Sequence, residues 1–278
     1  MSRLKIAAIS YLNTAPLLWD FDRSPSSSDF EMSYTLPADC AEALRSGTAD
    51  IGIVPVASYA TIPDLLVVPD VAIAARRAVR SILLVSDASE SNVSKEHYLA
   101  GMRSIALDTS SMTSAALTKI LFAKWLGGPR HYKPMAPNLD VMLAECDAAL
   151  LIGDPALQVD RSRYFTLDLA EEWNACTGKP AVFAFWAIRK QALSGRDRVT
   201  ITNTFKGSRD RGLLPKNLEL IAEDWADRLS IPINDVQTYL TCNIHYYLDS
   251  PCLEGLHLFY RYAAEVGALP RAPELEFL

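Results

Sequence analysis

Two strongly apolar segments, residues 79–86 and 181–188, limit how this 278-residue chain can fold. Short, continuously apolar runs of this kind are typical of strands that are buried on both faces. The block between them, residues 87–180, itself alternates strands and helices. If both segments cross between two halves of the molecule, residues 87–180 form a lobe inserted into a second lobe made of residues 1–86 and 181–278. A cleft between two such lobes is the natural site for a small molecule.

The first part of the chain alternates strand and helix patterns. Apolar runs at residues 4–9, 30–36 and 50–55 predict strands, and Pro37 begins a short helix that Gly47 ends. This alternation predicts an α/β fold with a mainly parallel sheet covered by helices. From residue 190 onward, the pattern predicts mostly helices.

Composition and motifs disfavour several classes of protein. The chain has 27 basic and 33 acidic residues and a net charge of −6, so nucleic-acid backbones and anionic membranes repel it. No apolar run is long enough to cross a bilayer or to form a signal peptide, so we expect a cytoplasmic protein without membrane contact. Five cysteines without CxxC spacing, scattered histidines and the lack of nucleotide motifs predict no metal and no cofactor. The expected partner is a small molecule, bound by a monomer or a homodimer.

Polar residues follow three of the predicted strands. They are residues 10–14, residues 108–114 after a strand at 105–107, and Gly153 with Asp154 after a strand at 148–152. The carboxyl ends of strands face the ligand crevice in open α/β sheets, so we expect these clusters to converge. Ser81 lies inside an apolar strand, where it is either a satisfied sheet hydroxyl or part of the same site.

The cluster at residues 108–114 predicts an anion site at the start of a helix. Unpaired backbone N–H groups and the helix dipole favour a carboxylate or a phosphate there. The hydroxyl residues around this helix start are Thr109, Ser110, Ser111, Thr113 and Ser114. Simple capping is the alternative, as it is for Asn13 and Asp154, because each lies close to the start of a short predicted helix.

Five segments together resemble one enzyme family. They are residues 9–17 (ISYLNTAPL), 49–56 (ADIGIVPV), 110–114 (SSMTS), 151–157 (LIGDPAL) and 173–186 (WNACTGKPAVFAFW). Through them the chain resembles the chorismate dehydratases of the futalosine route to menaquinone, along nearly its whole length. The resemblance implies a type 2 periplasmic-binding-protein-like fold, with two αβ lobes joined by two crossing strands and a ligand cleft between them. It also implies a lyase that removes water from chorismate to give 3-[(1-carboxyvinyl)oxy]benzoate.

For this reaction we expect Asn13 to be the catalytic residue, by holding the reacting hydroxyl or a carboxylate of the substrate. The residues expected to bind the substrate are Ser81, Ser111, Thr113, Ser114, Gly153 and Asp154. Two proton acceptors stay open, Asp154 and the substrate's own side-chain carboxylate. We favour the substrate carboxylate, because an ionised Asp154 repels a dianion.

Two other functions are weighed against dehydration. One is a cytoplasmic protein that binds a small carboxylate without changing it. The other is the related dihydroxynaphthoate-forming enzyme of the same pathway, whose family carries a different amino-terminal motif and a histidine in its site. No histidine lies in any of the three polar clusters here, which favours the dehydratase.

Overall fold

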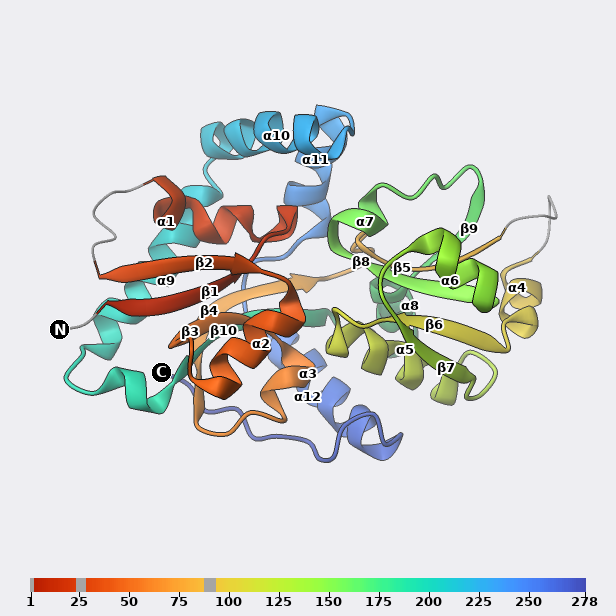
Figure 1. The fold of residues 1–278 in the computed structure, drawn as a ribbon, viewed down its shortest axis with the longest axis horizontal. Helices are drawn as coiled ribbons and strands as arrows, with labels where there is room; N and C mark the ends of the chain where they lie inside the picture. The colour runs from red at the N-terminus through yellow and green to blue at the C-terminus, as the bar shows by residue number, and fades with distance from the viewer. Residues whose placement is uncertain (1–2, 24–28, 88–93) are drawn as a thin grey trace.

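The computed structural model describes residues 3–23, 29–87 and 94–278, and it divides the protein into two lobes (Figure 1). Each lobe is built on a five-stranded sheet. The first sheet has the order β2-β1-β3-β10-β4, from β1 (Leu4–Ile9), β2 (Phe30–Thr35), β3 (Ile51–Pro55), β4 (Leu65–Ala75) and β10 (Ala181–Arg189). The second has the order β7-β6-β8-β5-β9, from β5 (Ile82–Asp87), β6 (Ser104–Asp108), β7 (His131–Met135), β8 (Ala148–Ile152) and β9 (Tyr164–Asp168).

The two sheets share one arrangement of strand directions. In the first, β1 is parallel to β2 and β3, whereas β10 is antiparallel to both β3 and β4. In the second, β6 is parallel to β7 and β8, whereas β5 is antiparallel to both β8 and β9. The antiparallel strand of each sheet is therefore the one that the chain enters after passing over from the other lobe.

The two strongly apolar segments of the sequence correspond to these antiparallel strands, β5 and β10. Neither of them runs through both lobes, because the chain passes over between β4 and β5 and again between α8 (Leu169–Thr177) and β10. Residues 82–86, expected in the first lobe, pair with β8 and β9 and so lie in the second sheet. The expected boundary after residue 86 is therefore too late, because apolarity shows that a strand is buried but not which sheet buries it.

Helices flank both sheets, and the carboxyl-terminal helices return to the first lobe (Figure 1). Pro37 begins α2, and Gly47 ends it with φ 77° and an N–H donated to the Leu44 carbonyl. The helices of the second lobe, besides α8, are α4 (Lys95–Gly101), α5 (Met112–Lys124), α6 (Leu139–Glu145) and α7 (Gly153–Leu157). Those of the first lobe are η1 (Leu12–Leu18), α1 (Trp19–Arg23), α2 (Pro37–Ser46), α3 (Val56–Tyr59), η2 (Lys190–Leu193), α9 (Arg198–Gly212), α10 (Pro215–Leu229), α11 (Ile233–Thr238), η3 (Tyr239–Asn243) and α12 (Ser250–Glu265). Within the described residues, no helix combines the length and the apolarity needed to span a membrane.

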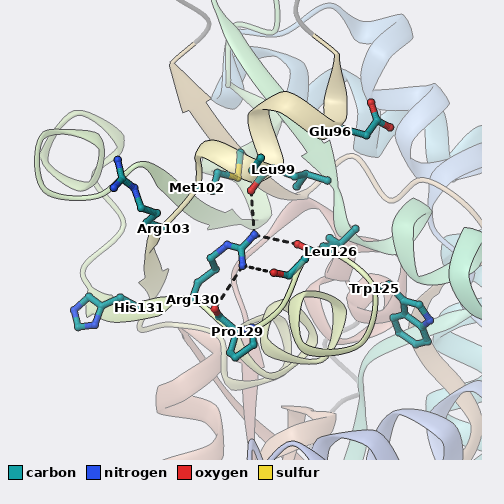
Figure 2. A pocket seen from close by; sticks show the side chains of 11 residues that line it. Glu96, Leu99, Met102, Arg103, Trp125, Leu126, Pro129, Arg130 and His131 are labelled. Carbon is teal, nitrogen blue, oxygen red and sulfur yellow. Dashed lines mark hydrogen bonds between the residues drawn. The ribbon is translucent and has the colours of Figure 1, made fainter.

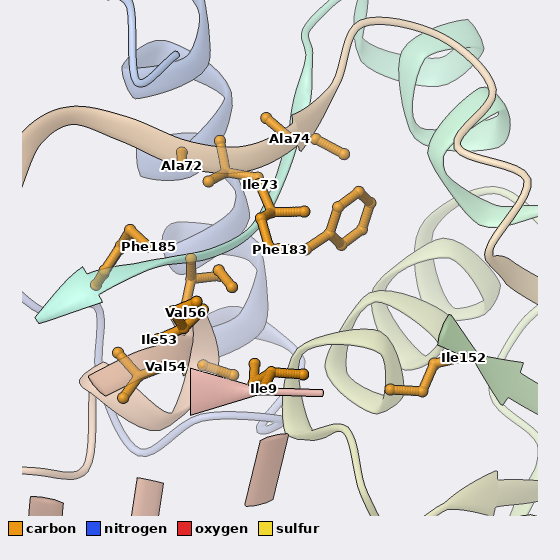
Figure 3. Packing of buried hydrophobic residues seen from close by; sticks show 14 of the residues in the cluster. Ile9, Ile53, Val54, Val56, Ala72, Ile73, Ala74, Ile152, Phe183 and Phe185 are labelled. Carbon is orange, nitrogen blue, oxygen red and sulfur yellow. The ribbon is translucent and has the colours of Figure 1, made fainter. Parts of the chain in front are cut away.

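One hydrophobic core runs from the first lobe into the second. Ile9, Val54 and Phe183 of the first sheet belong to the same buried cluster as Ile152 at the end of β8 (Figure 3). A second, smaller cluster fills the other face of the second sheet, where Leu83 alternates with Leu84 of the main core, as the period of a strand requires. Continuous packing at these strand ends fixes the two lobes against each other where polar side chains gather.

Candidate functional site

A small cavity of about 50 Å³ lies between the lobes, where β1, β3 and β8 end and α5 begins. Both lobes contribute to its wall, as expected for a ligand site at the carboxyl ends of strands. The lining residues are Ile9, Tyr11, Asn13, Pro37, Pro55, Ile73, Ser81, Ile82, Ser111, Ser114, Ile152, Gly153, Phe183 and Ala184. The structure thus brings together all of the expected site residues except Thr113 and Asp154.

A larger hollow lies at the amino ends of β6 and β7, the opposite end of the second sheet from the cavity (Figure 2). Its most prominent charged group is Arg130, whose guanidinium donates to the carbonyls of Leu99 at 3.1 Å, Leu126 at 3.2 Å and Gly128 at 2.6 Å. These carbonyls lie at the ends of α4 and α5, where backbone acceptors lack helical partners. Arg130 therefore ties two helix ends together, and we do not interpret this hollow as the site.

Asn13 does not cap a helix. The residue that caps η1 is Tyr11, and it does so without a side-chain hydrogen bond, so Asn13 lies within the first turn. Its Oδ1 atom is buried and has no hydrogen-bond partner within the described part of the chain. Burying an amide oxygen without a hydrogen-bond partner costs free energy of folding. This cost indicates that the Asn13 oxygen accepts a hydrogen bond from a bound ligand.

Ser81 belongs to a hydrogen-bonded pair that no sequence pattern predicts. It is only 1% exposed, and its Oγ accepts from the hydroxyl of Tyr239 at 2.8 Å. Burial raises the pKa of Tyr239 far above its usual value, so the phenol stays protonated and donates. Tyr239 lies 158 positions after Ser81, in a predicted helical stretch where a tyrosine is typical of a hydrophobic core. No local sequence pattern therefore identifies it as part of the site.

Ser111 and Ser114 form the start of α5 at the cavity wall. The Ser111 hydroxyl accepts from the backbone N–H of Ser114 at 3.2 Å and donates to the Ser114 Oγ at 2.9 Å. Thr113 is buried nearby but faces elsewhere. Its Oγ1 accepts from the Ala57 N–H at 3.1 Å and donates to the Phe183 carbonyl at 3.3 Å. The expected contact of the Thr113 hydroxyl with substrate is therefore not supported, because that hydroxyl joins α5 to the first lobe.

Asp154 also joins the two lobes. Its carboxylate does not cap α7 but accepts from the backbone N–H of Leu12 at 3.0 Å, next to Asn13. It does not line the cavity. Burial raises the pKa of this carboxyl to about 6, and the Leu12 N–H offsets only part of that effect. Asp154 is therefore placed to fix the segment that carries Asn13.

Replacing Asp154 with asparagine should remove the loss of stability that the wild type undergoes between acid and neutral pH. The raised pKa means that the folded state holds this proton more tightly than the unfolded state, so the wild type loses stability as pH rises from about 4 to about 6. One pKa unit corresponds to about 1.4 kcal/mol. The free energy of unfolding of Asp154→Asn minus that of the wild type should therefore be roughly 2–3 kcal/mol larger above pH 7 than below pH 4. Urea unfolding of both proteins across this range measures that gap. A gap that does not change with pH would show that Asp154 ionises freely.

Gly153 lines the cavity from the second lobe. Its φ of +62° is unfavourable for other residues, and a Cβ placed there would lie 2.6 Å from Cε2 of Tyr11. Tyr11, whose pKa burial raises to about 12, interacts with Ser110 beside α5. A glycine is therefore required for the Tyr11 ring to lie flat on this turn.

One cluster within the described residues has the atoms of a metal site, and it lies outside the cavity. The ligand atoms of His245, Asp249 and Cys252 are within 4.8 Å of one another. Arg76 already pairs with the Asp249 carboxylate at 2.6 Å, and His245 lies 2.9 Å from the same oxygen. The Arg76 guanidinium thus supplies the positive charge in this cluster. None of the residues of the cluster lines the cavity.

Comparison with known proteins assigns the chain to a family. The profile of a family described as menaquinone biosynthesis matches residues 4–265. The chain belongs to this family. A relative from Thermus thermophilus, named chorismate dehydratase, is 30% identical over 281 residues, covering 95% of this chain and 94% of the relative. The resemblance predicted from the five sequence segments is confirmed.

Solved structures show which fold this member of the family has. A protein from Archaeoglobus fulgidus superposes with a TM-score of 0.68 at 13% identity, covering 96% of this chain and 98% of that one. The periplasmic aliphatic sulphonate binding protein of Escherichia coli gives 0.67 at 13% identity, covering 100% and 94%. A Candida albicans protein described as having the generic periplasmic binding protein fold gives 0.64 at 12%, covering 98% and 92%. The predicted periplasmic-binding-protein-like α/β fold is confirmed.

Proposed function

We propose that this protein removes water from chorismate, the activity for which its Thermus relative is named, and that the product is 3-[(1-carboxyvinyl)oxy]benzoate. The observation that carries the proposal is the pair of polar side chains at the cavity wall. The Asn13 Oδ1 is buried without a partner among the residues that the structure describes, and the Ser81 hydroxyl lies beside the same cavity. These groups suit a small polar substrate enclosed between the lobes.

The electrostatics of the cavity support a dianionic substrate. Chorismate carries two carboxylates, so a protein with a net charge of −6 must provide local positive potential. Two helices begin at the cavity, α5 at Ser111 and α2 at Pro37, one from each lobe. The start of α2 has no side-chain cap, and because Pro37 has no N–H, the backbone N–H of Ala38 is the first that can donate to an anion there. Each carboxylate can thus be assigned one helix start.

The substrate's own side-chain carboxylate is the better candidate for the proton acceptor. Asp154 directs its carboxylate to the Leu12 N–H and does not line the cavity, which supports excluding it as the base. The substrate carboxylate takes the proton from the ring carbon that bears the ether, and that C–H electron pair forms the new ring double bond. The neighbouring C–O bond breaks with its electron pair going to the hydroxyl oxygen, which takes up the proton that the carboxylate removed and leaves as water. Aromatisation makes the step downhill, so positioning by Asn13 and Ser81 suffices.

The test is direct incubation of the purified protein with chorismate. We expect a product lighter by one water, detected by mass spectrometry, together with the loss of chorismate absorbance. Heat-inactivated protein is the control for spontaneous decay. Binding of chorismate in calorimetry without any such product would refute the enzyme and favour a carboxylate-binding protein. The dihydroxynaphthoate-forming alternative is disfavoured, because no histidine is among the residues that line the cavity in the described structure.

A further inference from the structure

We infer that Tyr239 is a positioning residue, which sets the hydrogen-bonding directions of Ser81 and Asn13 toward the cavity. The inference deepens the proposed function and rests on it. Tyr239 is 1% exposed and does not line the cavity, so it acts through the two residues that do.

The contact with Ser81 determines which way the serine hydroxyl donates. A tyrosine hydroxyl has one proton, and here it is donated to the Ser81 Oγ at 2.8 Å. The Ser81 oxygen is thus occupied as an acceptor on the side of Tyr239, and its own proton must point elsewhere. Since Ser81 lines the cavity, this proton is available to a ligand. Tyr239 therefore makes Ser81 a hydrogen-bond donor at the site.

The contact with Asn13 determines which end of the amide faces the cavity. The Asn13 side chain lowers the pKa of Tyr239 against the effect of burial, which is the influence of a group that donates to the phenol oxygen. The Tyr239 proton is already committed to Ser81, so the amide must offer its N–H to the phenol oxygen. The Asn13 Oδ1 is then left as a buried acceptor that no other group in the described part of the chain contacts by a hydrogen bond. Tyr239 therefore makes Asn13 an acceptor at the site.

A donor beside an acceptor is the complement of a hydroxyl group. The hydroxyl of the substrate can donate to the Asn13 Oδ1 and accept from the Ser81 hydroxyl at once. When the C–O bond breaks, its electron pair goes to that oxygen, and the hydrogen bond from Ser81 strengthens as the charge develops. A carboxylate, which only accepts, would leave the Asn13 oxygen unpartnered. The arrangement thus selects the leaving hydroxyl for this part of the cavity.

The backbone around Tyr239 holds it against the segment that carries Ser81. Tyr239 begins η3, a π-helical turn of a kind frequent at functional sites. At the end of the same turn, the Asn243 Nδ2 donates to the Ala78 carbonyl at 2.9 Å. This turn of the first lobe therefore contacts residues 78–81 at two points, just before β5 enters the second lobe.

The test is a comparison of two tyrosine variants that each lose one buried hydroxyl. Tyr239→Phe keeps the ring and removes both contacts. Tyr246→Phe is the matched control, because the Tyr246 hydroxyl is buried without a partner within the described residues and does not line the cavity. We expect Tyr239→Phe to lower kcat for chorismate at least tenfold with less than a threefold change in KM, and Tyr246→Phe to match wild type. Melting temperatures of both variants should stay within a few degrees of wild type, since the fold keeps both rings.

A double-variant cycle with Ser81→Ala separates positioning from a general structural effect. If Tyr239 acts through Ser81, the two losses must not multiply, so Tyr239→Phe should cost clearly less in the Ser81→Ala background than in wild type. Multiplying losses, or a Tyr239→Phe variant as active as wild type, would overturn the inference. Wild-type protein that gives no product from chorismate would instead refute the proposed function, so the two failures are distinguishable.

Discussion

Replacing Asn13 with alanine should lower kcat for chorismate roughly a hundredfold or more while the protein stays folded. Removal of one group that contacts the transition state in an enclosed site typically costs about 10²–10³ in rate. The stability should fall by only about 0.5–1.5 kcal/mol, because Asn13 caps no helix and the contact that is lost is the one with Tyr239. Steady-state kinetics, calorimetry of chorismate binding and thermal unfolding of the same preparation measure the three quantities. We expect binding to weaken by less than tenfold.

Asn13→Asp tests the same residue by charge. The shape is retained, but the donor to Tyr239 is replaced by an acceptor, and the added negative charge repels a dianion. Both binding and turnover should therefore fall. Near-normal turnover of Asn13→Ala would show that the site is misplaced. Loss of activity in Asp154→Asn, with Asn13→Ala active, would identify Asp154 as the proton acceptor and refute the substrate-assisted route.

Most of the strands follow from local patterns, but β4, β7 and β9 were not predicted. The predicted strands at residues 4–9 and 148–152 match β1 and β8. β4 was not predicted, although it is the longest strand described, with 11 residues. Pro69 and Asp70 interrupt its apolar run. The strand accommodates them because β4 lies at the edge of the sheet and its pairing with β10 shifts register at these residues. Asp70 has a φ of 65°, a turn-like conformation that only the tertiary pairing accommodates within a strand.

The cavity wall was more predictable than the contacts behind it. Asn13, Ser111 and Gly153 follow strands directly, so topology brings them to one edge. Thr113 and Asp154 come from the same polar clusters, but their side chains join the lobes, and no sequence pattern distinguishes a hydroxyl facing a ligand from one facing a carbonyl. Tyr239 comes from a helical segment remote from every cluster. Its place depends on how the carboxyl-terminal helices pack on the residues between β4 and β5.

Replacing Gly153 with alanine should destabilise the protein by roughly 2–5 kcal/mol and remove most of its activity. The positive φ alone costs an alanine about 1–2 kcal/mol. The new methyl group would also lie 2.6 Å from the Tyr11 ring, and overpacking of this kind typically costs about 1–3 kcal/mol more. Tyr11 lines the cavity, so its displacement should reach the substrate as well. Urea unfolding and chorismate kinetics measure the two effects.

Gly178→Ala is the matched control, because it shares the backbone strain without the collision. Gly178 ends α8 with a φ of 69°, and a Cβ added there meets nothing within 4 Å. This variant should therefore lose only about 1–2 kcal/mol and keep wild-type turnover. The difference between the two variants isolates the contact of Gly153 with Tyr11. Equal losses of stability, with activity retained in both, would mean that Tyr11 moves aside at no cost and that its position does not shape the site.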